Sequence, residues 1–367
     1  MRRFPITVFI LLLSTVLAKA QGPIFQEKSG FGLETQHYFE QADAAFDAGN
    51  MESAAELYAV AFEADQQNTK ALYNLALANF NLTNYGKAEV ALDKLLQLTP
   101  NDTAAFELLG HTLLNRGKAE RAVECFDIVL QAKATDARYV NRALAKIAIR
   151  HTDEALNDLD MALQLNPQNF EACLGKGITL MELGQPTLAS AWLQKALEVK
   201  PADATALTNL AVIKYRMGEK PAAMDDFRAA LRSSRQSGTY LARAKCYLLD
   251  QNFSDAISDA REAMLLDGEN AEVYAFIGEV ELAKGDVKAA VESFGIAIDL
   301  KPDQAAHYMK RADANIQGKQ FYEAVADLYR ALDLDPYNLE AKAMLQVAYS
   351  HIDVDVQGGQ TLSERND

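Results

Sequence analysis

An internal repeat constrains this chain more than any other feature of its sequence. The segment DEALNDLDMALQLNP at residues 153–167 returns as YEAVADLYRALDLDP at residues 322–336. The two segments lie 169 residues apart, which equals five periods of about 34 residues. A period of this length is typical of a unit of two helices and a turn that is repeated along the chain.

Nine such repeats can be aligned, with positions counted from the first residue of each. They span residues 35–68, 69–102, 103–135, 136–169, 170–203, 204–236, 237–270, 271–304 and 305–338. Position 20 is alanine in all nine: Ala54, Ala88, Ala122, Ala155, Ala189, Ala223, Ala256, Ala290 and Ala324. Position 8 is alanine or glycine in all nine: Ala42, Ala76, Gly110, Ala143, Gly177, Ala211, Ala244, Gly278 and Ala312. Small side chains let two helices approach closely, and alanine favours helix. We therefore expect positions 8 and 20 to lie where the two helices of a repeat cross.

Turn residues recur at two further positions. Position 15 is glycine in five repeats, where the first helix must stop and reverse. Position 32 is proline in five repeats, and proline cannot continue a helix. The third and sixth repeats are one residue shorter and lack this proline, and Arg150 stands where a glycine is usual.

The residues that recur at positions 8, 15, 20 and 32 resemble the pattern of the tetratricopeptide repeat family across residues 35–338. The resemblance implies an all-α fold, a right-handed superhelical α-solenoid of nine helix–turn–helix repeats whose first helices line a concave groove. Residues 339–351 are expected to form a capping helix, because one apolar face and one charged face suit the open end of a stack. Residues 21–34 are interpreted as a leader and residues 352–367 as a flexible tail.

Residues 1–20 have the pattern of a secretory signal peptide. Arg2 and Arg3 precede an apolar run over residues 6–17, and small residues flank Lys19 before a cleavage point between Ala20 and Gln21. We expect an exported protein, periplasmic or secreted, with no stable membrane span once the signal is removed. The residue directly after the cleavage point is glutamine and not cysteine, so a lipoprotein is not expected. An uncleaved signal that serves as a membrane anchor is the alternative.

Charge and residue counts exclude several classes of function. The formal net charge is -15, and removal of the three cations of the signal makes it -18, which disfavours nucleic acid and anionic membranes as partners. Three cysteines do not form a disulfide framework, and we expect them to be buried apolar residues. The five histidines are scattered, so neither a metal site nor a cofactor is predicted.

The resemblance implies that positions 2, 5, 9, 12 and 13 reach into the groove. In this chain, many of these positions have apolar side chains, in addition to the positions that are expected to form the core. The predicted partner-binding residues are Phe39, Tyr73, Leu77, Phe80, Val140, Leu144, Ile178, Met181, Val212, Tyr215, Leu241 and Leu248. An exposed apolar patch of this extent would mark an interaction surface for a protein or peptide. The alternative is that these side chains simply pack in the core.

A specialised carboxylate clamp known in this family is absent. It requires lysine and asparagine at positions 5 and 9 before an asparagine at position 6, whereas Phe39 and Asp43 precede Asn74. No nucleophile elbow or glycine-rich phosphate loop is present. We therefore expect a non-enzymatic protein–protein interaction scaffold outside the cytoplasm. The alternative is a structural component of a cell-envelope assembly that binds through its convex face or edges, and an enzyme or carbohydrate-handling protein is least favoured.

Overall fold

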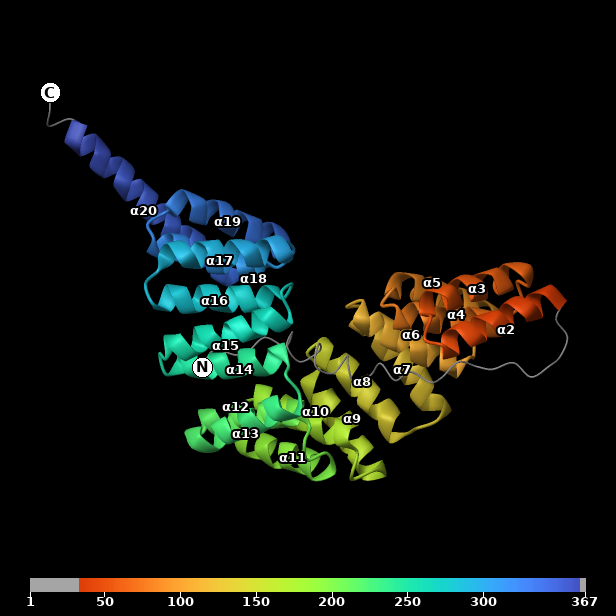
Figure 1. Cartoon of the computed structure of the whole chain (residues 1–367). Helices are drawn as coiled ribbons and strands as arrows, with labels where there is room; N and C mark the ends of the chain where they lie inside the picture. The colour runs from red at the N-terminus through yellow and green to blue at the C-terminus, as the bar shows by residue number, and fades with distance from the viewer. Residues whose placement is uncertain (1–32, 364–367) are drawn as a thin grey trace. The chain divides into compact units, whose positions relative to one another are not determined.

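Helices make up most of the chain that the structure describes. The structure is a computed structural model that describes residues 33–363, and within that range it contains helices and no strand (Figure 1). The predictions of an all-α fold and of successive helix pairs are therefore confirmed. The predicted signal peptide, its cleavage point and most of the leader lie outside the described residues.

The chain divides into two compact units, residues 1–201 and 202–367, here called the N-terminal unit and the C-terminal unit. The N-terminal unit contains α2 (Leu33–Asp47), α3 (Met51–Ala64), α4 (Thr69–Asn81), α5 (Tyr85–Leu98), α6 (Thr103–Asn115), α7 (Ala119–Ala132), α8 (Asp136–Ala148), α9 (Thr152–Leu165), α10 (Phe170–Glu182) and α11 (Pro186–Val199). The C-terminal unit contains α12 (Ala204–Arg216), α13 (Lys220–Ser233), α14 (Ser237–Leu249), α15 (Phe253–Leu266), α16 (Ala271–Ala283), α17 (Val287–Leu300), α18 (Ala305–Gln317), α19 (Phe321–Leu334) and α20 (Leu339–Ser363). Within each unit, helices that are neighbours in the chain pack against each other.

Short polar side chains cap the starts of most first helices, with α14 and α18 as exceptions. From the second repeat on, each first helix begins at the first residue of its repeat. The side chain of Asn68 accepts a hydrogen bond from Ala71 N at 3.0 Å, and Asp203 accepts one from Ala206 N at 2.8 Å. These side chains satisfy N–H groups that have no partner inside the helix, which favours the helix start at that point.

The turn between the two helices of a repeat has one backbone conformation throughout. Position 15 has a positive φ in every repeat, although only five of these residues are glycine. The other four are Thr83, Arg150, Gln251 and Lys319, with φ between 56° and 62°. Hydrogen bonds that reach back into the first helix hold this turn, for example Asn84 N to Asn79 O at 2.8 Å. The left-handed turn is thus imposed by these bonds and costs little only where glycine is present.

The small-residue columns occupy the core. Every alanine at position 20 has no exposed surface, and the same is true of all six alanines at position 8. Position 27 is also fully buried in all nine repeats, including Leu95 and Val129 where alanine is replaced. The three glycines at position 8 have no room for a methyl group. A Cβ on Gly110 would lie 2.7 Å from the Phe126 ring, and one on Gly177 would lie 2.7 Å from Leu193.

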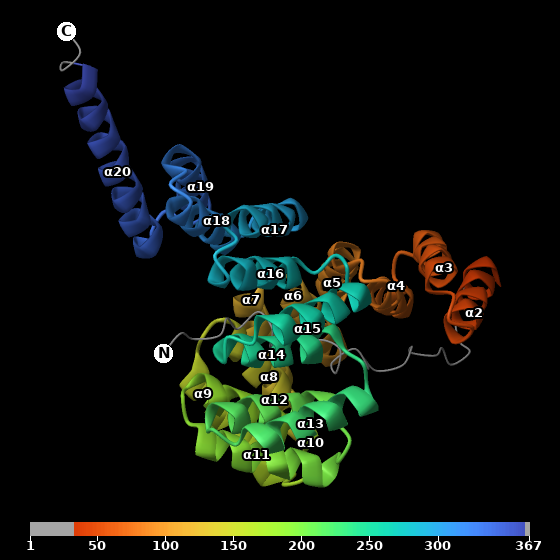
Figure 2. The same cartoon turned by 60° about the vertical axis from the view of Figure 1, so that its left-hand side comes forward.

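The C-terminal helix is longer than predicted. α20 continues from Leu339 to Ser363, so most of the expected flexible tail from residue 352 is helical. In both views the C-terminal half of α20 extends beyond α19 (Figures 1 and 2). Ala341 and Ala348 are fully buried where the first half packs in the C-terminal unit. Elongating a helix costs less than nucleating one, and no proline stops α20 after His351.

None of the helices in residues 33–363 combines the length and the apolar character needed to cross a membrane.

The contact at position 8 generates a test. Gly110→Ala should lower the free energy of unfolding by about 1–3 kcal/mol, because the new methyl group overlaps the Phe126 ring. The matched control is Gly86→Ala, which meets open space in α5 and should be neutral or stabilising by up to about 1 kcal/mol. Urea unfolding followed by far-UV circular dichroism measures both. Phe126→Leu should restore part of the loss in the Gly110→Ala background, and equal effects of the two alanine substitutions would contradict this packing.

Candidate functional site

Most of the predicted groove residues are buried. Nine of the twelve are between 1% and 6% exposed: Phe39, Tyr73, Leu77, Phe80, Val140, Leu144, Ile178, Tyr215 and Leu241. Successive first helices contact each other, for example α4 with α6 and α8 with α10, and their apolar side chains are covered there. The expectation of an exposed apolar stripe is therefore wrong for these nine residues. Only Met181, in the N-terminal unit, and Val212 and Leu248, in the C-terminal unit, are partly exposed.

Burial raises the pKa of both tyrosines among the predicted groove residues. Burial, with the nearby negative charges of Asp102 and Glu107, raises the pKa of Tyr73 to about 12. Burial also raises the pKa of Tyr215, whose hydroxyl donates a hydrogen bond to Asp250. Lys220 Nζ lies 2.7 Å from both oxygens of the same carboxylate. Tyr215 therefore links α12 to the turn after α14 and does not offer its hydroxyl to a partner.

A buried histidine, His111, occupies an expected groove position, position 9, in the N-terminal unit. Asn141 Nδ2 lies 3.3 Å from His111 Nε2, which joins α6 to α8, and the His111 ring packs edge-on against Phe126. Burial lowers the pKa of His111 to about 4, so this histidine is neutral near neutral pH. The contact between Asn141 and His111 therefore contributes to helix packing.

One face of the C-terminal unit keeps its first-helix side chains partly accessible. We call it the α14–α18 face and define it by positions 9 and 12 of three successive first helices: Lys245, Leu248, Glu279, Leu282, Asp313 and Ile316. The three apolar members are half-buried, and Asp313 is exposed. Lys310 Nζ pairs with Glu279 at 2.7 Å and so connects α18 to α16. The face therefore alternates apolar and charged side chains.

Leu282 and Ile316 were missed by the sequence analysis. Both occupy position 12, the column that contains the predicted residue Leu248. Their acidic neighbours, Glu279 and Asp313, made these two helices look unlike an apolar surface. The shared position 12 could nevertheless have identified both residues.

A recurring ion pair was also missed. Arg142 pairs with Asp158, Arg243 with Asp259 and Arg311 with Asp327 through two hydrogen bonds each, at 2.6–2.9 Å. In each case position 7 on the first helix meets position 23 on the second helix of the same repeat. Every repeat with arginine at position 7 has aspartate at position 23, and this correlation could have revealed the contact.

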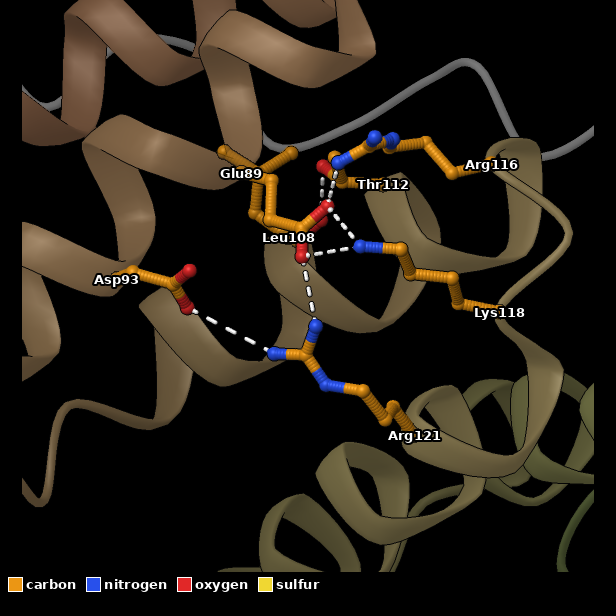
Figure 3. Close-up of polar contacts among 7 residues, drawn as sticks. All are labelled: Glu89, Asp93, Leu108, Thr112, Arg116, Lys118 and Arg121. Carbon is orange, nitrogen blue, oxygen red and sulfur yellow. Dashed lines mark hydrogen bonds and ion pairs between the residues drawn. The ribbon is translucent and has the colours of Figure 1, made fainter.

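A further cluster surrounds Glu89 on α5 (Figure 3). Lys118 Nζ lies 2.9 and 3.1 Å from the two carboxylate oxygens, Arg121 lies at 2.6 Å, and Arg116 also pairs with this carboxylate. Burial alone would raise the pKa of Glu89, but the hydrogen bonds from Lys118, Arg121 and Arg116 lower it to about 2. The cluster joins α5 of one repeat to the α6–α7 turn and the first turn of α7 in the next.

The cysteines show no sign of reactivity. Cys125, Cys173 and Cys246 are buried and form no disulfide. Burial raises the pKa of Cys125 to about 11 and that of Cys246 to about 12, so both thiols stay protonated near neutral pH. Within the described part of the chain, no group of three or more histidine, cysteine or acidic residues is placed to hold a metal ion.

The Glu89 cluster makes stability depend on pH. The pKa of Glu89 falls from an ordinary value of 4.5 to about 2 on folding, so its stabilising contribution is complete above about pH 5 and is lost as the pH falls towards 2. Glu89→Gln should therefore lower the free energy of unfolding by about 3 kcal/mol at neutral pH and by much less near pH 2. Urea unfolding at several pH values measures the difference. A gap between the two proteins that stays constant with pH would contradict this assignment.

Comparison with known proteins agrees with this architecture. The family profile of the tetratricopeptide repeat matches residues 39–103, 150–213 and 277–338, together about half of the chain. Anaphase-promoting complex subunit 3 of Schizosaccharomyces pombe is 20% identical over 73% of this chain and 46% of its own length. DnaJ homolog subfamily C member 3 of Homo sapiens is 25% identical over 78% of this chain and 53% of its own length. The chain thus spans about half the length of these two relatives.

Solved structures show the same fold at low sequence identity. A tetratricopeptide repeat protein from Parabacteroides merdae has a TM-score of 0.62 and 19% identity, covering 68% of this chain and 100% of that one. Yeast Tom70 has a TM-score of 0.56 and 17% identity, covering 90% of this chain and 84% of that one. With its successive helix pairs, its small-residue columns and the matching profile, this chain belongs to the tetratricopeptide repeat family.

Proposed function

We propose that this protein is a non-enzymatic protein–protein interaction scaffold that binds a segment of a protein partner on the α14–α18 face. The observation that carries this proposal is the partial exposure of Leu248, Leu282 and Ile316 on three successive first helices. Each of these helices packs on the next within the C-terminal unit, so the three side chains come from the same position of three adjacent helices.

The chemistry of this face suits a peptide with both apolar and charged side chains. Completing the burial of a half-buried leucine or isoleucine stabilises a complex by roughly 1 kcal/mol, about half of the value for full burial. The exposed carboxylate of Asp313 and the Lys310–Glu279 pair stand beside the apolar residues and would orient a partner through its charges. Several such contacts together are needed for stable binding, because association itself costs free energy.

The family supports an interaction role in general terms. One relative, anaphase-promoting complex subunit 3, is named as a subunit of a complex. We propose a similar role in protein interactions for the present chain, and we do not propose the same partner.

A second candidate is a structural component that binds through the second helices. Several apolar side chains there are exposed, including Val90 at 69%, Leu188 at 52% and Leu265 at 75%. These residues lie on α5, α11 and α15, away from the first-helix positions of the α14–α18 face. This arrangement would favour assembly through the outer surface.

Site-specific crosslinking distinguishes the two surfaces. A photocrosslinking amino acid at Asp313, on the α14–α18 face, should capture a discrete partner in cells that produce the protein. The same amino acid at Ile296, which is 44% exposed on the second helix α17, is the matched control in the same unit. Leu282→Asp should abolish capture from position 313 while circular dichroism shows a folded chain. Capture from position 296 alone would favour the second candidate.

We also propose that the protein acts outside the cytoplasm. The support is the arrangement of Arg2 and Arg3, the apolar run over residues 6–17 and the small residues before Gln21.

The export proposal has a direct test. Full-length protein expressed with its own N-terminus in a Gram-negative bacterium should be recovered from the periplasm with Gln21 as its first residue, as measured by intact mass. Leu12→Arg interrupts the apolar run and should leave an unprocessed chain in the cytoplasm. Recovery of the unmodified sequence from the cytoplasm with residues 1–20 intact would exclude export by this signal.

A further inference from the structure

The Glu89 cluster contains more positive charge than its own carboxylates neutralise. Three cations, Arg116, Lys118 and Arg121, converge on the single buried carboxylate of Glu89. Among the residues that the structure describes, the one further acidic group that pairs with them is Asp93, which is 3.8 Å from Arg121 and has a side chain that is 48% exposed. By comparison, Arg243 and Asp259 pair one to one, as do Arg311 and Asp327.

The three cations remain accessible while they hold Glu89. Their side chains are 36%, 39% and 46% exposed, whereas that of Glu89 is 6% exposed. The close-up shows them reaching the carboxylate from the α6–α7 turn and from the first turn of α7 (Figure 3). A carboxylate with this environment fixes the positions of the cations, and their outward surfaces stay open to solvent. The geometry is therefore preorganised before any ligand arrives.

The backbone adds positive charge at the same place. Lys118 is the residue before α7, and its side chain does not cap the N–H groups at the start of this helix. These groups carry the positive end of the helix dipole, which favours an anion near the helix start. Glu120, in the first turn of α7, offsets part of this charge.

We propose that Arg116, Lys118 and Arg121 form a docking site for an acidic segment of a protein, in which glutamate or aspartate side chains pair with these cations. The carboxylates of the segment would accept hydrogen bonds from the nitrogen atoms that face away from Glu89. A short acidic segment suits this corner better than a nucleic acid, because a long polyanion would also meet the acidic side chains of Asp93 and Glu120 beside the cations. At physiological salt, charges farther than about 8 Å are largely screened, so the local cluster decides the contact.

This inference goes beyond the proposed function, because the site lies in the N-terminal unit and on residues that the α14–α18 face does not use. Its failure would leave the crosslinking result at Asp313 intact, and the reverse is also true.

Fluorescence anisotropy with synthetic peptides tests the site. The probe is a short fluorescein-labelled peptide of alternating glutamate and serine, and its partner probe replaces each glutamate with glutamine. The full chain should bind the acidic peptide and not the glutamine peptide, and affinity should fall as salt rises. The double variant Arg116→Gln, Lys118→Gln should weaken binding by about tenfold or more, since it removes two charge-assisted contacts.

Two controls separate charge from folding. Lys118→Arg keeps the positive charge and should bind like the unmodified chain, whereas Lys118→Gln should bind more weakly. Lys284→Gln removes an exposed cation at position 14 of the eighth repeat, the position that Arg116 occupies in the third, and should change nothing. Circular dichroism melts of each variant show whether the chain remains folded at the assay temperature.

Three outcomes would overturn the proposal. They are equal binding of the two peptides, unchanged affinity in the folded double variant, and displacement of the acidic peptide by inorganic phosphate at low millimolar concentration. The last result would indicate an unselective anion site.

Discussion

The structure depends on the close approach of paired helices at small side chains. Alanine or glycine at position 8 and alanine at position 20 let the two helices of each repeat come together without a gap. Large side chains such as Phe126 fill the space that a glycine leaves open. A helix of 13 or 14 residues is marginal in water on its own, so each repeat is stable only through these contacts and those with its neighbours.

Charged side chains supplement this apolar packing in particular repeats. The pairs of Arg142, Arg243 and Arg311 with aspartate join the two helices within a repeat. The Glu89 cluster and the contact of Tyr215 with Asp250 instead join one repeat to the next. Partly buried pairs of this kind contribute more than exposed ones, because water screens them less. The same contacts remove side chains such as Tyr215 from the surface available to partners.

Side-chain size along the chain predicts the architecture well and the accessible surface poorly. Columns such as Ala54 to Ala324 predict where helices touch, because only small residues are tolerated there in all nine repeats. The turn could be located from five glycines, yet Thr83 and Arg150 adopt the same left-handed backbone without glycine. For the site, an apolar residue such as Leu144 looks the same in a sequence whether it is covered by a neighbouring helix or left exposed. The length of α20 was missed because a helix that is already nucleated can continue even through residues of low helix propensity such as Gly358 and Gly359.

The sequence by itself determined the repeat, the all-helical fold and the positions at which helices meet, because each of these follows from periodic side-chain size along the chain. Only the tertiary structure decided which side chains remain accessible. Packing between successive first helices covers Leu77 and Ile178 but leaves Leu248, Leu282 and Ile316 partly open. It also brings Glu89 beside three cations that lie 27 to 32 residues further along the chain. Accessibility and charge clustering depend on how neighbouring repeats are placed in space, and a single repeat does not contain that information.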